Sequence, residues 1–323
     1  MGNRSRREAA RSAARMEGKL YKGQDYKTEF QPRDYLKTFY AFDSGTVAEN
    51  EILKFNLNNL FETFSPGGVG GDILIDVGTG PTIYQLISAC EAFREIIMSD
   101  YSELNLREVD KWLKKDPGAY DWSPAMQYVC GLEGDRSKWQ EKEARLRRTV
   151  TRLLTCDVNQ PRPLGSAQVP AADCVLSLLA LECACQDVDA YRAAIRNLVG
   201  LLKPGGHLVT SVALRCHEYM VGSRKFFGLS LEKETVEKAL QEASCQVLKC
   251  QYSPIKYSEA YCVNEGHCFV VPARSPGPEA SLGDSACPEG EVRVPKSSKS
   301  GAPCCRVSLN TITSFCTMSP GHK

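Results

Sequence analysis

The sequence predicts an α/β protein with a mostly parallel sheet and helices on both faces. Short apolar runs, typical of buried strands, alternate with stretches of helical periodicity along most of the chain. A glycine-rich turn, VGTG at residues 77–80, directly follows the first run, at the position where parallel sheets bind ligands. The 323 residues, 42% of them hydrophobic, are enough to bury one large core.

The part of the chain before the first strand divides into a leader and a helical cap. Residues 1–23 begin with the arginine-rich, nearly acid-free stretch MGNRSRREAARSAAR, and we interpret them as a disordered basic leader. Apolar residues then recur at helical spacing from about Asp34 to Phe64 and stop at the turn sequence SPGG. Helices are therefore expected to precede the sheet.

Seven apolar runs are expected to form the sheet. Five of them alternate with helical stretches such as Asp187–Leu202 and are predicted to be parallel; they are Ile73–Asp76, Ile96–Ser99, Leu153–Cys156, Cys174–Leu179 and Leu208–Ala213. The last two, Cys245–Tyr252 and Gly266–Val271, have no clear helix between them, which favours an antiparallel edge pair.

Beyond Arg274 the composition changes abruptly to Ser, Pro, Gly and Lys. Such a segment cannot bury enough apolar surface to fold, so we predict that residues 274–323 are a disordered tail. Its adjacent Cys304 and Cys305 have no second pair at the spacing of metal ligands.

Charge and cysteine usage limit the classes of partner. The formal net charge is +1, which gives no overall attraction to nucleic acid or to an anionic membrane. The 15 cysteines are scattered and several lie inside apolar runs, as buried thiols do, so we expect no metal site and a reducing, cytoplasmic location. No apolar segment is long enough to span a membrane. The sequence also shows no exposed apolar helix face that would indicate a subunit interface, so a monomer is expected.

The glycine turn indicates a nucleoside without a diphosphate. A dinucleotide fingerprint needs a third glycine and free N–H groups, but Ile83 stands at the third position and Pro81 has no N–H. S-adenosylmethionine is a nucleoside with a charged, phosphate-free tail, and Asp100, about 20 residues downstream, is placed to accept its ribose hydroxyls. Two turn glycines followed by an unrelated helix-capping Asp would give the same pattern.

Longer motifs strengthen this interpretation. Five runs together resemble the small-molecule amine N-methyltransferases, the family of the nicotinamide, phenylethanolamine and indolethylamine enzymes, and the run at 178–215 is most similar to the indolethylamine branch. The five runs are FQPRDYLKTFYAF (30–42), LIDVGTGPTIYQLISACEAF (74–93), SDYSELN (99–105), EVDKWLKKDPGAYDWSP (108–124) and LLKPGGHLV (201–209). The resemblance covers residues 24–273, and it implies a class I S-adenosylmethionine-dependent methyltransferase fold, Rossmann-like, over that domain.

The resemblance also implies a set of cofactor contacts. Tyr35 and Tyr40 would close over S-adenosylmethionine, and Gly78 and Thr79 would hold its methionine end. Tyr84, on the helix expected after Pro81, would also contact it. The remaining contacts would be Asp100 and Asn105 at the ribose, Asp157 and Val158 at the adenine, and Leu178 after the fourth strand.

The acceptor side departs from the nicotinamide enzyme. The positions that match an aspartate and a serine of that enzyme are Val212 and Gly228 here. Because the loss of a buried hydrogen-bond partner costs about 1–3 kcal/mol, we expect nicotinamide to bind poorly. Tyr219 and Tyr257 are candidates to face the acceptor, since aromatic faces stabilise a cation.

Methyl transfer to an amine needs alignment, exclusion of water and a free lone pair on nitrogen. Tyr35 and Glu182 are the candidate catalytic residues: Tyr35 lies on the closing segment, and Glu182, just past the fourth strand, is placed to orient the amine or take its proton. Two simpler interpretations stay open, namely that Glu182 only caps the helix near Asp187 and that Tyr84 is an ordinary packed aromatic residue.

The sequence therefore predicts N-methylation of small amines such as indolethylamines. Methylation of thioether sulfur and of nicotinamide are the alternatives within this chemistry. A protein that binds S-adenosylmethionine without turnover is the alternative from another class. A small-molecule amine or thioether is the expected partner in the enzymatic cases, with no nucleic acid and no membrane.

Overall fold

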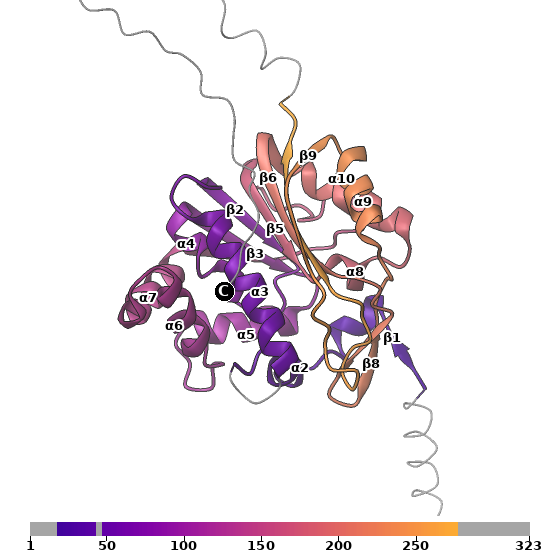
Figure 1. The fold of residues 1–323 in the computed structure, drawn as a ribbon, viewed down its shortest axis with the longest axis horizontal. Helices are drawn as coiled ribbons and strands as arrows, with labels where there is room; N and C mark the ends of the chain where they lie inside the picture. Colours follow the sequence, from indigo (N-terminus) through magenta and orange to yellow (C-terminus); the bar gives the residue numbers. More distant parts are fainter. Residues whose placement is uncertain (1–17, 43–46, 277–323) are drawn as a thin grey trace, which may run out of the picture. The chain divides into compact units, whose positions relative to one another are not determined.

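A computed structural model describes residues 18–42 and 47–276 of the chain (Figure 1). A sheet of seven strands lies at its centre, in the order β4-β3-β2-β5-β6-β10-β9. The five strands from β4 to β6 pair in parallel, and β10 pairs antiparallel with both β6 and β9. The strands are β2 (Gly71–Val77), β3 (Phe93–Asp100), β4 (Val150–Thr155), β5 (Ala172–Leu178), β6 (Leu202–Ala213), β9 (Cys245–Ser253) and β10 (His267–Arg274).

Helices cover both faces of this sheet, as the alternation of strands and helices predicts (Figure 1). Neighbouring strand residues face opposite sides, so Leu74 joins one buried apolar cluster and Ile75 the other. The first cluster contains apolar residues of α2 (Pro32–Phe39), α3 (Val47–Phe64), α5 (Glu103–Leu113), α6 (Ser123–Leu132) and α7 (Trp139–Thr149). The second contains residues of α9 (Val188–Val199) and α10 (Lys233–Glu242).

The N-terminal cap begins earlier than we expected. Residues 18–23 belong to the predicted leader, but Leu20–Tyr21 form strand β1 and pair in parallel with β8 (Arg224–Phe227). Together with β7 (Glu218–Val221) they make a second sheet, in the order β1-β8-β7, which sequence analysis missed. Tyr21 is buried with its ring centroid 5.5 Å from that of Phe226, and this packing fixes a segment too short to show a periodic pattern.

The expected helix after Pro81 is also wrong. The chain forms only the short 3-10 turn η2 (Tyr84–Leu86) and the four-residue helix α4 (Ala89–Ala92) before β3. The Gln85 side chain contacts Asp76, Thr79 and Thr82, so the segment is held by side-chain hydrogen bonds close to the end of β2. Three short elements complete the described chain: η1 (Gly23–Lys27), η3 (Arg136–Lys138) and α8 (Leu181–Ala184).

Residues 1–17 and 277–323, which hold most of the predicted leader and tail, lie outside the described residues. In the described part of the chain, no helix has both the length and the apolar character to cross a membrane. Within 18–42 and 47–276 there is also no group of three or more His, Cys, Asp or Glu side chains placed to hold a metal ion.

Candidate active site

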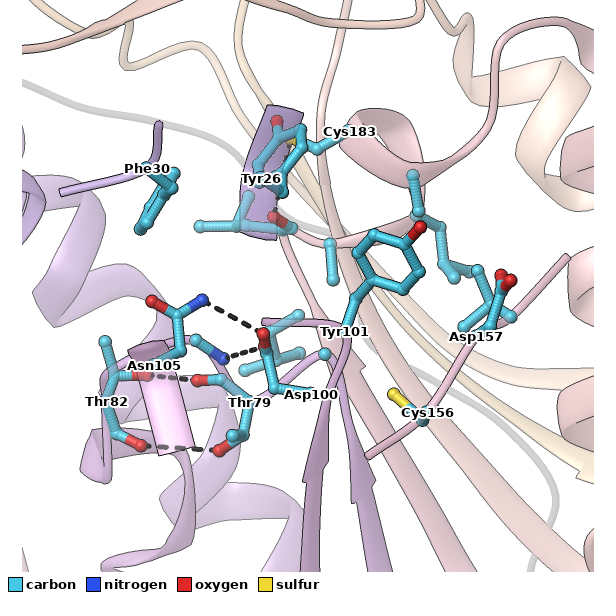
Figure 2. A pocket seen from close by; sticks show the side chains of 18 of the residues that line it. Tyr26, Phe30, Thr79, Thr82, Asp100, Tyr101, Asn105, Cys156, Asp157 and Cys183 are labelled. Carbon is cyan, nitrogen blue, oxygen red and sulfur yellow. Dashed lines mark hydrogen bonds between the residues drawn. The ribbon is translucent and has the colours of Figure 1, made fainter. Parts of the chain in front are cut away.

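A cavity of about 550 Å³ opens at the carboxyl ends of the parallel strands β2 to β5 (Figure 2). This volume lies in the range of small-molecule sites. All ten residues predicted to contact the cofactor line it, which are Tyr35, Tyr40, Gly78, Thr79, Tyr84, Asp100, Asn105, Asp157, Val158 and Leu178. The fold therefore brings together residues that are spread over more than half of the domain sequence.

The glycine turn packs closely against the loop after β5. Gly78 and Gly80 have φ values of 76° and 61°, in the left-handed region that favours glycine. A Cβ on Gly78 would lie 2.5 Å from the Cβ of Ala180, so no larger residue fits there. The amides of Gly78 and Thr79 donate to the Ser99 carbonyl at 2.9 Å, and Gly80 N donates to Asp100 Oδ2 at 2.8 Å. These bonds leave the three amides committed within the chain, which disfavours a diphosphate ligand.

Asp100 and Asn105 form a buried polar pair at the wall of this cavity (Figure 2). Asp100 Oδ1 accepts from Ser102 N at 2.8 Å and from Asn105 Nδ2 at 3.0 Å. Burial raises the pKa of Asp100, although these hydrogen bonds oppose the shift. Asn105 Oδ1 is buried without a hydrogen-bond partner, so it is an acceptor available to a ligand hydroxyl.

A second polar network at the end of β2 includes two lining residues that sequence analysis missed, Asp76 and Gln85. Gln85 Nε2 donates to Asp76 Oδ2 at 2.8 Å and to Thr79 Oγ1 at 2.9 Å. Burial raises the pKa of Asp76 to about 7. The signal was present in the sequence, because a carboxylate inside the apolar run ILIDV requires buried partners.

Aromatic side chains form the wall beneath the N-terminal cap. The hydroxyls of Tyr35 and Tyr40 are 3.3 Å apart, and the rings of Tyr40 and Tyr84 have centroids 5.1 Å apart. Tyr26 and Phe30 also line the cavity and were missed, although both lie within the predicted domain. Burial raises the pKa of all four tyrosines, so their hydroxyls are neutral at physiological pH.

A smaller cavity of about 40 Å³ adjoins the large one and shares Tyr35, Leu179, Cys183 and Tyr219 with it. Tyr219 and Tyr257, the two tyrosines proposed for the acceptor, both line it. The other lining residues are Phe39, Glu182, Ala213, Cys216 and Cys262. A carboxylate, aromatic rings and thiols therefore surround this space.

Glu182 lies in α8 with 2% of its surface exposed. Its Oε1 accepts from Ala213 N at 3.0 Å, while its Oε2 is buried without a hydrogen-bond partner. Burial raises the pKa of Glu182 to about 7, and the hydrogen bond from Ala213 opposes the shift. The capping interpretation is wrong, because Asp187 itself caps α9 by accepting from Ala190 N at 2.8 Å.

Val212 and Gly228 do not line either cavity. Side chains alternate along β6, so Ala213 faces the small cavity while Val212 is fully buried in the second apolar cluster, on the other face of the sheet. A Cβ on Gly228 would lie 3.0 Å from the Cys216 carbonyl oxygen and 3.1 Å from Cys216 Sγ, so this glycine packs against a residue that lines the small cavity. The argument against nicotinamide therefore gains no support from a contact of the Val212 side chain.

Comparison with known proteins agrees with this geometry. The model of the NNMT/PNMT/TEMT family matches residues 18–275. Indolethylamine N-methyltransferase of Mus musculus is 67% identical over 81% of this chain and 99% of its own length. Nicotinamide N-methyltransferase of Homo sapiens is 52% identical over 76% of this chain and 93% of its own length. Phenylethanolamine N-methyltransferase of Macaca mulatta is 40% identical over 68% of this chain and 78% of its own length.

The family match begins at residue 18, close to the start of β1, and so supports the correction made to the leader. It covers more than two thirds of the chain and includes every residue that lines the two cavities. The resemblance found in the sequence is confirmed, as is enzymatic use of S-adenosylmethionine as the methyl donor. The chain is an N-methyltransferase and belongs to the NNMT/PNMT/TEMT family.

Proposed function

We propose that this enzyme methylates the nitrogen of small aromatic ethylamines, the class to which indolethylamines belong. The observation that carries the proposal is the free Oε2 of Glu182, buried in a small cavity that adjoins the large one. An amine must lose its proton before its lone pair can attack a methyl group. A carboxyl group with a pKa of about 7 is suited to accept that proton near neutral pH.

The large cavity is the proposed cofactor site, and the residues that line it fit S-adenosylmethionine. Asp100 and the unpartnered Asn105 Oδ1 would accept from the ribose hydroxyls. Asp157 and Val158 would contact the adenine, and the carboxylate network of Asp76 would face the charged methionine end. When bound, the cofactor supplies an electrophilic methyl group on a sulfonium.

The aromatic side chains between the cavities would serve alignment and shielding. Tyr35 and Tyr219 line both cavities, and the Tyr219 hydroxyl lies 2.6 Å from that of Tyr26. Neutral rings at this place stabilise a positive charge as it moves from sulfur to nitrogen, and their bulk excludes water. Tyr35 would therefore position the reacting groups and shield them from water, whereas Glu182 would accept the proton of the amine.

Thioether sulfur is a second candidate acceptor, for a specific reason. Three thiols line the small cavity, those of Cys183, Cys216 and Cys262. Much of its wall is therefore apolar and polarisable, which suits contact with another sulfur atom. A thioether also needs no base, because its sulfur carries no proton.

A radiolabelled methyl-transfer assay with tryptamine, nicotinamide, phenylethanolamine and dimethyl sulfide tests the proposal. We expect tryptamine to be the best acceptor, and we expect Glu182→Gln to lower its methylation by roughly 10²- to 10⁴-fold, the usual contribution of a general base. The variant should also lose the rise in amine methylation around pH 7, while dimethyl sulfide methylation is retained.

Glu237→Gln is the matched control, because Glu237 lies on α10 in a surface ion pair with Lys233 and lines neither cavity. Equal loss of amine and thioether methylation in Glu182→Gln would contradict a role as base. A clear preference for nicotinamide would overturn the proposed acceptor class.

Three further proposals concern the whole chain. We propose a domain that extends from residue 18 to about residue 275 between a basic leader and a Ser/Pro/Gly-rich tail, supported by the family match and the composition. The 11 cysteines of the described part are all free thiols, which supports a reducing, cytoplasmic location. A monomer is the proposed oligomeric state, and size-exclusion chromatography with light scattering would test it.

A further inference from the structure

Two cysteines from separate loops meet in the wall of the small cavity. Cys216 follows β6, Cys262 lies between β9 and β10, and their Sγ atoms are 3.2 Å apart. Each residue has only 4% of its surface exposed, and each lines the cavity. The pair is therefore shielded from bulk solvent but borders the space proposed for the acceptor.

The two loops are already held together beside this pair. Tyr219 forms an antiparallel bridge with Cys262, and Met220 N donates to the Tyr261 carbonyl at 2.7 Å. A disulfide has an S–S bond of about 2.05 Å, so bond formation would draw the sulfurs together by roughly 1 Å. The backbone contacts keep the partners in reach without a rearrangement of the sheet.

We propose that Cys216 and Cys262 form a reversible oxidation site that shuts the acceptor cavity when hydrogen peroxide converts the two thiols to a disulfide. One deprotonated thiol attacks a peroxide oxygen, the O–O bond breaks, and a sulfenic acid and hydroxide form. The second thiol then attacks the sulfenic sulfur, the S–S bond forms, and water leaves. The two thiols lose two electrons and two protons, and one peroxide becomes two water molecules.

The reduced pair is stable until an oxidant enters. The hydrogen bond with Cys262 and burial both raise the pKa of Cys216, so both proton loss and reaction are slower than at an exposed cysteine. Peroxide is small enough to enter a 40 Å³ cavity, since this volume exceeds the roughly 10–15 Å³ that a cavity needs to hold one water molecule. We expect it to enter from the 550 Å³ cavity, because the two cavities share four lining residues.

The disulfide should act on the acceptor and spare the cofactor. Neither Cys216 nor Cys262 lines the large cavity, so cofactor binding is expected to survive oxidation. The loss of acceptor turnover rests on the proposed function of the small cavity, whereas formation of the bond does not. The two parts of the inference can therefore be tested separately.

The chain offers a matched control in a second thiol pair. Cys250 Sγ and Cys268 Sγ are 3.5 Å apart, but neither residue lines either cavity, and Cys268 is packed in the second apolar cluster. Oxidation of this pair should leave methyl transfer unchanged. Cys250→Ser tests whether the second pair accounts for any effect of peroxide.

Tryptic digestion after peroxide treatment, under non-reducing conditions, identifies the bond directly. Cleavage places Cys216 in the peptide 216–224, Cys250 in 250–256, and both Cys262 and Cys268 in 257–274. We expect mass spectrometry to detect 216–224 linked to 257–274, two hydrogens lighter than the sum of the two reduced peptides, and to lose this species on dithiothreitol treatment. Fragmentation of the linked species should place the bond at Cys262 and not at Cys268. Absence of this species from peroxide-treated full-length protein would overturn the inference.

Activity and calorimetry then test the consequence. Peroxide should abolish transfer to the best acceptor of the panel, dithiothreitol should restore it, and S-adenosylmethionine should bind with unchanged affinity throughout. Each variant is compared with itself before and after oxidation, and Cys216→Ser and Cys262→Ser should resist while Cys250→Ser stays sensitive. Equal sensitivity of all three variants, or loss of cofactor binding together with activity, would contradict closure of the acceptor cavity.

Discussion

Asn105 combines two polar roles in one buried side chain. Its Nδ2 donates to Asp100 and orients the carboxylate, while its Oδ1 is buried without a partner at the wall of the large cavity. An unsatisfied buried acceptor is unfavourable unless a ligand completes it. The side chain is therefore expected to contribute to cofactor affinity both directly and through Asp100.

Asn105→Ala should raise the dissociation constant for S-adenosylmethionine by roughly 5- to 150-fold, which corresponds to about 1–3 kcal/mol for a lost buried hydrogen bond. Isothermal titration calorimetry measures the change. Asn59→Ala is the control, because Asn59 is also buried and donates to the Phe55 carbonyl within α3. An unchanged affinity in Asn105→Ala would argue against ribose binding at this position.

The residue types at the site were predictable where they occur in motifs. Asp100, Asn105 and the glycine turn belong to runs with specific spacing, and all of them line the large cavity. Gln85 was missed because its importance comes from hydrogen bonds made after folding, whereas Asp76 could have been recognised as a carboxylate inside an apolar run. Val212 was placed at the acceptor because a sequence match does not show which face of a strand a side chain occupies.

The element that carries the N-terminal cap is the small sheet β1-β8-β7. Phe226 of β8 is fully buried, and the rings of Tyr21, Tyr26 and Phe30 lie with centroids 4.9 to 5.5 Å from its own. Tyr26 and Phe30 also line the large cavity. One phenylalanine therefore connects the hairpin of β7 and β8 to a segment that lines the large cavity.

Phe226→Ala should lower the free energy of unfolding by about 3–5 kcal/mol, as for other buried aromatic residues, and should also weaken cofactor binding because Tyr26 and Phe30 lose their support. Phe64→Ala is the matched control, since Phe64 is buried against Phe93 and lines neither cavity. Urea unfolding and calorimetry, performed where both variants are folded, separate the effects. If Phe226→Ala and Phe64→Ala lost the same amount of affinity for S-adenosylmethionine, Phe226 would not support cofactor binding through Tyr26 and Phe30.

At the level of elements, the seven central strands were predictable and the small sheet was not. The inner strands β2, β3, β5, β6 and β10 contain consecutive buried residues that face both sides of the sheet, so their apolar runs are long enough to recognise. The edge strands β4 and β9 are partly exposed, and only their shorter apolar stretches indicated them. The strands β1, β7 and β8 have only two to four residues each, and the pairing of β1 with β8 joins segments about 200 residues apart. The prediction of a helix after Pro81 was wrong for a similar reason, because the side-chain hydrogen bonds of Gln85 outweigh the helical periodicity of the local sequence.

Across the whole molecule, three buried carboxyl groups with a raised pKa, those of Glu182, Asp76 and Asp100, make stability depend on pH. Burial raises the pKa of Glu182 from 4.5 to about 7, and that of Asp76 from 3.8 to about 7. The folded protein holds protons there that the unfolded chain releases, so this contribution is fully present below about pH 4 and is lost as the pH rises through about 7. His267 acts in the opposite direction, since burial lowers its pKa from 6.5 to about 4.

Glu182→Gln should therefore become more stable relative to the parent enzyme as the pH rises from about 5 to about 8, by a difference on the order of 3 kcal/mol. The amide keeps the acceptor for Ala213 N and removes the buried charge. Urea unfolding at a series of pH values measures the difference. Glu237→Gln should show no such trend, and a pH-independent offset in Glu182→Gln would show that its carboxyl group titrates normally.

The position of β10 has a consequence for how the chain is made. It is the last strand in sequence, yet it lies between β6 and β9, and in the described sheet β9 has no other neighbour. During synthesis, β9 and one edge of β6 stay unpaired until the residues of β10 emerge from the ribosome. Their free backbone N–H and C=O groups can pair with strands of other chains during this time. Translation that stops before residue 267 would leave one edge of β6 open and β9 without any partner in the sheet, and such exposed strand edges are prone to aggregate.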